Sequence, residues 1–359
     1  MTIELCLYNA PGEQSDNGDV IDCVHVYHHQ PELKKHPSPR MNVTAMAAAA
    51  AARLQARPQT WQKYGSCPEG TAPIRRASPN ANSEVVERVL RASPFGRPGG
   101  AGKVVLPESM DTSKGKVEVA AAYACNAPYL GARVHIPHWH VNVHPDEFSM
   151  NYLLIGYTLD SKFRPFPGHS PPDSLPNQIA VGLVNDGGVH NNCFNLDCGG
   201  FHVQPSPYAL GGAWNGVSQL GGDRFTIPVS IHRDPTEEKW WVSVKGHDIG
   251  YYPESVFDTR FPEAFYVEMG GRVLNTRPGG KHTTTPMGSG MPPCAGWRFA
   301  AEAGSYYAVN YNGVISNDWA DRTVVTTPGC YDAKPRGFDK NKGGYFVLFG
   351  GPGGIYCDK

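Results

Sequence analysis

From about residue 116 onward, hydrophobic side chains recur at every second position. In residues 225–231, Phe, Ile, Val and Ile alternate with Thr, Pro and Ser; in residues 138–143, His, His and Asn alternate with Trp, Val and Val. Residues 240–244 and 345–349 are further strand-like runs, and clusters of Gly, Pro, Asn and Asp separate them. A period of two places successive side chains on opposite faces of a β-strand. The pattern therefore predicts an all-β fold, either a β-sandwich or a β-barrel.

The composition agrees with this fold class and excludes two classes of partner. The chain has 41 glycines and 32 prolines among 359 residues, as expected for many turns, and its 40% hydrophobic content can build a core. A net charge of -1 gives no electrostatic basis for binding nucleic acid or an anionic membrane. No apolar run approaches the roughly 20 residues that a membrane span needs. We expect neither nucleic acid nor membrane as a partner, and the oligomeric state stays open.

The chain divides into three parts by composition. Residues 1–78 form a small N-terminal unit that contains several histidines and an alanine-rich segment. Residues 79–115 contain scattered prolines and a glycine-rich run, which is typical of a linker. Residues 116–359 carry the period-two pattern and form the main domain.

Nine cysteines indicate an oxidising compartment, although no signal peptide is visible at Met1-Thr2-Ile3-Glu4. No C-x-x-C pair suggests a zinc ribbon, and the odd count leaves at least one free thiol. Asn42-Val43-Thr44 is a sequon for N-glycosylation, which is relevant if the protein is secreted.

Several segments resemble the neprosin family, which comprises plant-type secreted prolyl endopeptidases of the glutamic class. They occur in the order of that family over nearly the whole chain. In the N-terminal unit they are Asp19-Val20-Ile21-Asp22-Cys23 and residues 67–76 (CPEGTAPIRR). In the main domain they are residues 129–132 (YLGA), 193–201 (CFNLDCGGF), 240–241 (WW), 250–253 (GYYP), 287–290 (MGSG), 330–332 (CYD) and 349–353 (FGGPG).

The resemblance implies a small activation-type domain followed by an antiparallel β-sandwich of two sheets. It also implies three disulfides, Cys23–Cys67, Cys193–Cys198 and Cys330–Cys357, which leave Cys6, Cys125 and Cys294 over. The activity of the family is acid-pH endoproteolysis, typically after proline, without a metal or organic cofactor. The expected location is extracellular or vacuolar, and the expected partners are proline-rich peptides or proteins.

Two glutamates carry the hydrolysis in this family: one acts as an acid and the other holds the nucleophilic water. The second lies in a strand reading roughly W-G-G-E, and the matching stretch here is Met269-Gly270-Gly271-Arg272. A guanidinium stays protonated and cannot act as a base. Arg272 therefore predicts the loss of one catalytic carboxylate.

The first glutamate lies in a family strand reading roughly N-x-I-E-A-G-W, and two alignments are open. One sets residues 177–182 on that motif and puts Ala180 at the glutamate. The other keeps Asp186 seven residues before Cys193 and puts the lost glutamate near Arg164. Neither affects the conclusion, because the chain has no glutamate between Glu147 and Glu237.

Three functions compete on these grounds. The first is a pseudopeptidase whose cleft binds peptides. The second is an active acid endopeptidase in which Glu268 works with Asp160, Asp173 or Asp186. Arg272 lies four residues after Glu268 on the same strand face, which favours an ion pair there instead. The third is a structural or carbohydrate-binding sandwich, indicated only by exposed aromatic residues.

A cluster of histidines is the remaining candidate site. His138, His140 and His144 have even spacing and are predicted to share one strand face, where neutral imidazoles could bind zinc or copper. The alternative is a solvated polar face opposite Trp139, Val141 and Val143, and we expect that alternative and no metal.

Overall fold

The computed structural model describes most of the main domain and two pieces of the N-terminal unit. The described residues are 18–25, 57–75, 115–126, 128–157, 177–186, 200–234, 236–257, 259–316, 318, 320–354 and 357. None of the helices in this part of the chain is long and apolar enough to cross a membrane.

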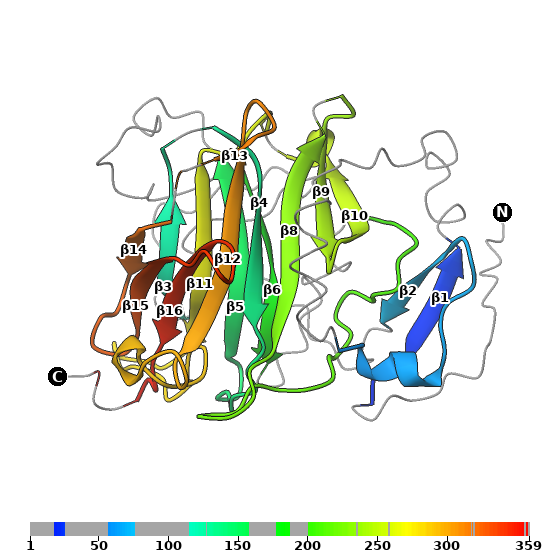
Figure 1. Cartoon of the computed structure of the whole chain (residues 1–359). Coiled ribbons are helices and arrows are strands. Elements are labelled where there is room, and N and C mark those ends of the chain that lie inside the picture. The colour runs from blue at the N-terminus through cyan, green and yellow to red at the C-terminus, as the bar shows by residue number, and fades with distance from the viewer. Residues whose placement is uncertain are drawn as a thin grey trace.

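Two antiparallel β-sheets stack face to face and form the main domain (Figure 1). The larger sheet has nine strands, with β13 paired beside β12. In spatial order they are β15 (Asp332–Phe338), β16 (Tyr345–Gly350), β12 (Ala301–Asn310), β4 (Tyr129–Pro137), β8 (Thr226–Asp234), β9 (Lys239–Val244), β10 (His247–Pro253) and β7 (His202–Val203), with β13 at Ile315–Ser316.

The smaller sheet has five strands and contains Glu268 and Arg272. In spatial order they are β14 (Arg322–Val325), β3 (Lys116–Ala124), β11 (Tyr266–Asn275), β5 (Phe148–Tyr157) and β6 (Asn177–Asp186). Three short 3₁₀ helices complete the described elements: η2 (Thr60–Tyr64), η5 (Glu254–Val256) and η6 (Pro293–Ala295).

The predicted all-β, antiparallel sandwich is confirmed. The predicted runs at 225–231, 240–244 and 345–349 become β8, β9 and β16. The run at 138–143 was expected to be a strand, and this is wrong. β4 ends at Pro137, and the next residues are extended without a strand partner; the backbone of His138, for example, bonds with Phe225 and Ser218. Alternation of side chains alone cannot distinguish a paired strand from an extended segment held by loops.

Hydrophobic residues from both sheets fill the space between them. The alternation in β8 places Ile227, Val229 and Ile231 in this core. The largest side chain with no exposed surface is Trp240 of β9, whose indole N–H donates to the carbonyl of Phe261 (2.8 Å). A second hydrophobic cluster lies on the other face of the five-stranded sheet, where Val119 of β3 and Met150 of β5 are buried.

Two glycines in β11 fix how closely the surrounding chain approaches. A Cβ on Gly270 would lie 2.5 Å from the backbone of Ala120 and Ala121, and one on Gly271 would lie 2.6 Å from Met287. No side chain fits at either position, because β3 packs on one side and Met287 on the other. The backbone just before Arg272 is therefore held at a fixed distance from its neighbours.

The N-terminal unit is a two-stranded sheet of β1 (Ile21–His25) and β2 (Thr71–Arg75) beside the β10 end of the large sheet (Figure 1). The predicted disulfide Cys23–Cys67 is present within this unit. The alanine-rich segment, the sequon at Asn42 and the predicted linker up to residue 114 lie outside the described residues. The first residue of β3 is Lys116.

Truncation of Trp240 should destabilise the fold. Trp240→Ala removes a fully buried indole and leaves a cavity, so we expect the free energy of unfolding to fall by about 3–5 kcal/mol. Trp297→Ala is the matched control, because Trp297 is 48% exposed, and it should change stability far less. Guanidinium denaturation followed by circular dichroism measures both; equal losses would contradict the packing.

His135, which is 4% exposed in β4, should make the fold acid-sensitive. Burial lowers its pKa to about 4, and the Arg133 guanidinium adds to this. The folded pKa of His135 lies below the unfolded value of about 6.5. The free energy of unfolding therefore keeps its full value above pH 6.5, and part of it is lost as the pH falls from 6.5 to 4. The loss amounts to about 3 kcal/mol. His135→Gln should flatten this part of a stability profile measured between pH 7 and 4. An unchanged profile would contradict the assignment.

Candidate active-site region on the five-stranded sheet

Glu268 and Arg272 lie on one face of the central strand β11, the face that carries the second hydrophobic cluster. The register is continuous, with Glu268 beside Tyr123 of β3 and Leu154 of β5, and Arg272 beside Val119 and Met150. Because no bulge interrupts β11, residues four apart point to the same side. The two side chains therefore meet, as the sequence predicts.

Three donor groups surround the Glu268 carboxyl group, which has no exposed surface. The Tyr152 hydroxyl donates to Oε1, and the Tyr266 hydroxyl donates to Oε2 at 2.6 Å. Arg272 Nη2 lies 3.5 Å from Oε1. A buried carboxylate needs partners of this kind to offset the loss of hydration. Glu268 is therefore held as an acceptor inside the structure.

Arg272 is a buried cation that stacks on an aromatic ring. Its guanidinium carbon lies 4.0 Å from the centroid of the Tyr152 ring, and its side chain is 8% exposed. Burial acts to lower the pKa of Arg272, but Tyr152 and Glu268 outweigh it, so the pKa is raised. Cation–π stacking and the ion pair together keep the charge in place. At no accessible pH does this group become a base.

Aromatic residues extend the cluster toward β3 and β14. The Tyr266 ring stacks on Tyr123 at 5.5 Å between centroids, and Arg322 lies 5.9 Å over Tyr123. Burial raises the pKa of Tyr152 and of Tyr266 well above 10, so both hydroxyls stay protonated and can donate. Burial also raises the pKa of the free thiol of Cys125, which opposes a role as nucleophile. On the described part of this face, the hydroxyls of Tyr152 and Tyr266 and the guanidinium of Arg272 therefore surround the carboxyl group of Glu268 as donors.

The first catalytic position depends on the alignment. Ala180 of β6 lies opposite Leu154, which lies opposite Glu268, so Ala180 belongs to the same row across the sheet. Arg164, Asp160 and Asp173 lie outside the described residues, and for Asp186 only the backbone in β6 is described.

A third alignment of the first catalytic glutamate is visible from the strand order and was missed from the sequence. Residues 151–157 of β5 read N-Y-L-L-I-G-Y and match N-x-I-E-A-G-W with Leu154 at the glutamate. Asn151, Gly156 and Tyr157 are the matching residues by which the sequence could have shown this alignment. β5 is the direct neighbour of β11, so this fit sets both family positions on adjacent strands. Ala180, Arg164 and Leu154 remain alternatives, and none of them is a carboxylate.

A second buried carboxylate, Glu147, was also missed from sequence. It has no exposed surface and accepts from the Thr276 backbone N–H (2.9 Å) and hydroxyl (3.0 Å), the Thr285 hydroxyl (2.5 Å) and the Thr283 hydroxyl. Four donors on one carboxylate indicate a structural anchor for residues 276–285.

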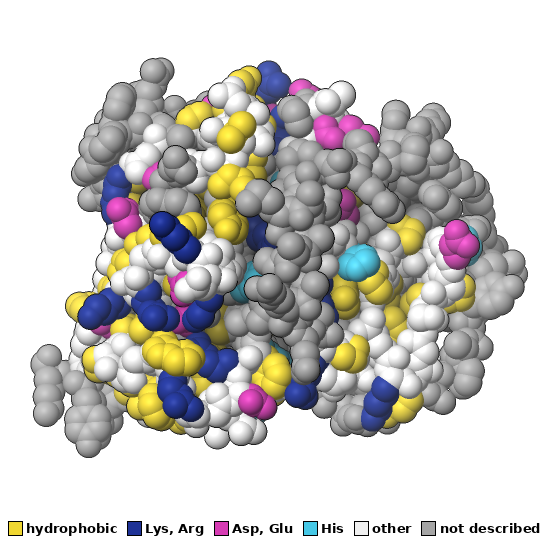
Figure 2. All heavy atoms as spheres, in the orientation of Figure 1, with side chains coloured by type: hydrophobic (Ala, Val, Ile, Leu, Met, Phe, Trp, Pro, Cys, Tyr) yellow, Lys and Arg dark blue, Asp and Glu magenta, His cyan; other side chains and the backbone are white. Residues whose placement is uncertain are grey.

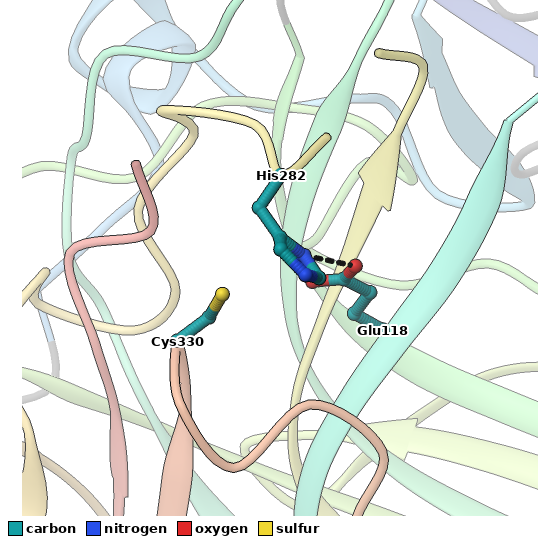
Figure 3. Close-up of side chains that lie close together, drawn as sticks. All are labelled: Glu118, His282 and Cys330. Carbon is teal, nitrogen blue, oxygen red and sulfur yellow. Dashed lines mark hydrogen bonds and ion pairs between the residues drawn. The ribbon is translucent and has the colours of Figure 1, made fainter. Parts of the chain in front are cut away.

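Glu118 of β3, His282 and Cys330 lie close together (Figure 3). His282 Nδ1 is 3.0 Å from Glu118 Oε1, and in the figure the imidazole points at the carboxylate. The ligand atoms of the three residues, the Cys330 sulfur included, lie within 4.8 Å of one another. Cys330 is bonded to Cys357, so its sulfur is not a thiolate. Two donors without the thiolate do not fit a zinc site, which takes at least three protein ligands.

The predicted histidine cluster is spread along an extended segment. His138 Nδ1 bonds to the carbonyl of Gly216 (2.7 Å), His140 is exposed, and His144 Nδ1 bonds to the carbonyl of Pro145 (2.9 Å). Among the described residues they are not one of the groups close enough to share a metal ion. The less favoured alternative of a metal site at these histidines therefore gains no support from this geometry.

The remaining cysteines agree with the expected pairing where they are described. Cys330–Cys357 is a disulfide, and Cys125 and Cys294 are free. Cys6, Cys193 and Cys198 lie outside the described residues.

Removal of one member of the buried ion pair should cost more than removal of both. Arg272→Met leaves Glu268 as an uncompensated buried charge, so we expect a loss of about 3–5 kcal/mol. Adding Glu268→Gln should recover part of this loss, because the amide is neutral, its oxygen still accepts from one tyrosine and its NH2 can donate to the hydroxyl oxygen of the other. Arg260→Met, at a residue 75% exposed, is the control and should cost less than about 1 kcal/mol. Denaturant unfolding of the wild type, Arg272→Met, Glu268→Gln, the double variant and the control measures the coupling; additive losses in the two single variants would contradict it.

Two protein-family models match the chain, and together they span most of it. The model described as Neprosin matches residues 177–352, which include β6 to β16. The model described as Neprosin activation peptide matches residues 13–123, which include β1, β2 and most of β3. With these matches, the two disulfides and the antiparallel sandwich, the chain belongs to the neprosin family.

Proposed function

We propose that this member of a family of glutamic prolyl endopeptidases has lost peptidase activity and uses the fold to bind peptides. One observation carries the proposal. Arg272, the residue that we align with the second catalytic glutamate, is a buried cation stacked on Tyr152 and paired with Glu268. A guanidinium cannot hold and deprotonate water, so the general base of the family reaction is missing.

The alternative of a substituted active site needs Glu268 to reach substrate and a second carboxyl group. Glu268 has no exposed surface, and its partners among the described residues are Tyr152, Tyr266 and Arg272. All three occupy its carboxyl oxygens inside the structure, whereas an acid catalyst must reach the leaving group of the substrate. These contacts favour a structural role for Glu268.

A carbohydrate-binding role rests on exposed aromatic residues. Figure 2 shows hydrophobic side chains among Lys and Arg side chains at the lower left, over the β15–β16 end. Trp297 is 48% exposed, but Arg224 and Lys342 lie 5.7 and 5.3 Å from its ring centroid. A sugar that stacks on this ring would compete with these cations. We therefore favour peptide binding, in line with the family.

The expected location is extracellular or vacuolar. Members of the family are secreted, and two disulfides form in the described part of the chain. Disulfides persist in oxidising compartments and are rare in the cytosol. The proposed partners are proline-rich peptides or proteins.

A cleavage assay tests the loss of activity. The protein, with and without prior acid treatment, is incubated with a proline-containing peptide at pH 3 to 5, and products are followed by mass spectrometry. We expect no turnover above the blank, because no carboxylate can act as base at residue 272. Cleavage that persists in Glu69→Gln, an exposed control, but disappears in Glu268→Gln would contradict the proposal.

A binding assay tests the retained function. Titration calorimetry with a proline-rich peptide should detect an affinity that a proline-free peptide of the same length and charge lacks. Because Glu268 is buried, Glu268→Gln should leave this affinity within about a factor of three if the fold is kept, as circular dichroism would verify. Equal binding of both peptides, or of neither, would contradict recognition of proline.

A further inference from the structure

The N-terminal unit, defined as residues 18–25 and 57–75, packs against the main domain through residues 201–216 and the strands β9 and β10. We propose that this unit is a permanent part of the fold and stays bound as a separate, noncovalent chain when the segment between residues 75 and 116 is cut. The partner surface is the end of the nine-stranded sheet, next to which Figure 1 places β1 and β2.

Gln59 is the centre of the interface. Its side chain is 1% exposed, and its amide makes four hydrogen bonds. Oε1 accepts from Trp61 Nε1 (2.7 Å) and Ala209 N (2.8 Å), and Nε2 donates to the carbonyls of Ala209 (2.9 Å) and Gly212 (3.1 Å). A Cβ on Gly212 would lie 3.0 Å from this amide. The main domain therefore forms a fitted socket for one N-terminal side chain.

Backbone pairing continues on both sides of this socket. The N–H of Thr60 donates to the carbonyl of Ala213 (2.9 Å), and the N–H of Asn215 donates to the carbonyl of Pro58 (3.0 Å). Asp19 joins the two parts: Oδ2 accepts from the N–H of Ala213 (3.1 Å), and Oδ1 accepts from Arg75 Nε (2.7 Å). On separation the paired backbone groups and Asp19 Oδ2 lose these partners, whereas the Asp19–Arg75 contact stays within the N-terminal unit.

An apolar contact covers the outer face of β9 and β10. Ala72 of β2 has no exposed surface and packs with Trp241 and Tyr251, which are 3% exposed. Trp241 points away from the inter-sheet core that holds Trp240 and Val242. Without the N-terminal unit these two rings would be exposed to water, which is unfavourable for large apolar surfaces.

Arg57 adds a contact at the edge of the interface. Its guanidinium carbon lies 4.4 Å from the centroid of the Phe225 ring, and its carbonyl accepts from Lys245 Nζ (2.7 Å). A Cβ on Gly216 would lie 2.9 Å from Arg57 Cδ. Two glycines of the main domain, Gly212 and Gly216, thus match the shapes of N-terminal side chains.

The described disulfides do not cross this interface. Cys23–Cys67 closes within the N-terminal unit, and Cys330–Cys357 closes within the main domain. Retention after a cut would therefore rest on the hydrogen bonds and apolar contacts above. The unit covers the nine-stranded sheet, whereas Arg272 faces out from the five-stranded sheet, so the described part of the unit does not cover the face of Arg272.

A cut in the linker tests retention. The recognition sequence of a site-specific protease is inserted between Gly100 and Ala101 of the full chain, free thiols are alkylated, and the cut protein is run on size exclusion at neutral pH. We expect one peak that holds both pieces, which then separate on a non-reducing denaturing gel. Two peaks at micromolar concentration would overturn the proposal.

Variants test the assigned contacts. Gln59→Leu keeps the volume but leaves the N–H and C=O of Ala209 without partners, so the dissociation constant of the cut pair should rise by at least about 30-fold. Near-ultraviolet circular dichroism of the uncut variant checks that it folds. Lys245→Ala removes one hydrogen bond across the interface and should raise the dissociation constant by less. Glu69→Gln, at an exposed residue, should raise it by less than about twofold. Unchanged affinity in both Gln59→Leu and Lys245→Ala would overturn the proposed interface.

Discussion

The close approach of β11 to its neighbours is the constraint on which the rest of the five-stranded sheet depends. At Gly270 and Gly271 the adjacent chain leaves no room for a Cβ, so the neighbouring strand β3 and Met287 on one face together define the position of β11. This fixes the register that places Tyr152 beside Gly270 and brings its hydroxyl to Glu268. A protein interior packed at this density cannot accept even one added methyl group without rearrangement.

Within that frame, Arg272, which stands where a catalytic glutamate was expected, is part of the packed structure. In a peptidase a carboxylate here must meet water and substrate, whereas Arg272 is buried and its charge is balanced by Glu268. Tyr152 serves two roles, because its ring stacks on the guanidinium and its hydroxyl donates to the carboxylate. Ion pairs in protein interiors are stable only when such additional contacts offset desolvation. The substitution therefore belongs to a network of matched residues.

The N-terminal unit shows the same kind of matching at the other sheet. Gln59 fits a socket of backbone groups in residues 209–212, and Ala72 covers Trp241 and Tyr251. These contacts join residues about 150 apart in sequence. The family model described as an activation peptide extends to residue 123, so it also includes most of β3, a strand inside the five-stranded sheet. That segment cannot be removed as a whole without dismantling the sheet.

Much of the fold could be predicted from sequence, because β-structure leaves a local pattern. Alternation predicted β8, β9 and β16, and the cysteine positions in family order predicted Cys23–Cys67 and Cys330–Cys357. The identity of residue 272 and the lack of glutamate between residues 147 and 237 are also facts of sequence alone. The extended segment after Pro137 was mistaken for a strand, because its partners are loop residues far along the chain.

The sequence by itself determined the class of fold, the family and the chemical nature of the side chain where a catalytic glutamate was expected. Only the tertiary structure decided what that side chain does. Tyr152 and Glu268 are 116 residues apart, and nothing local to either one indicates that they meet. Glu147 and Gln59 likewise depend on donors and acceptors from distant segments. The physical reason is that a buried polar group is defined by its partners, and chain folding, not sequence proximity, brings those partners together.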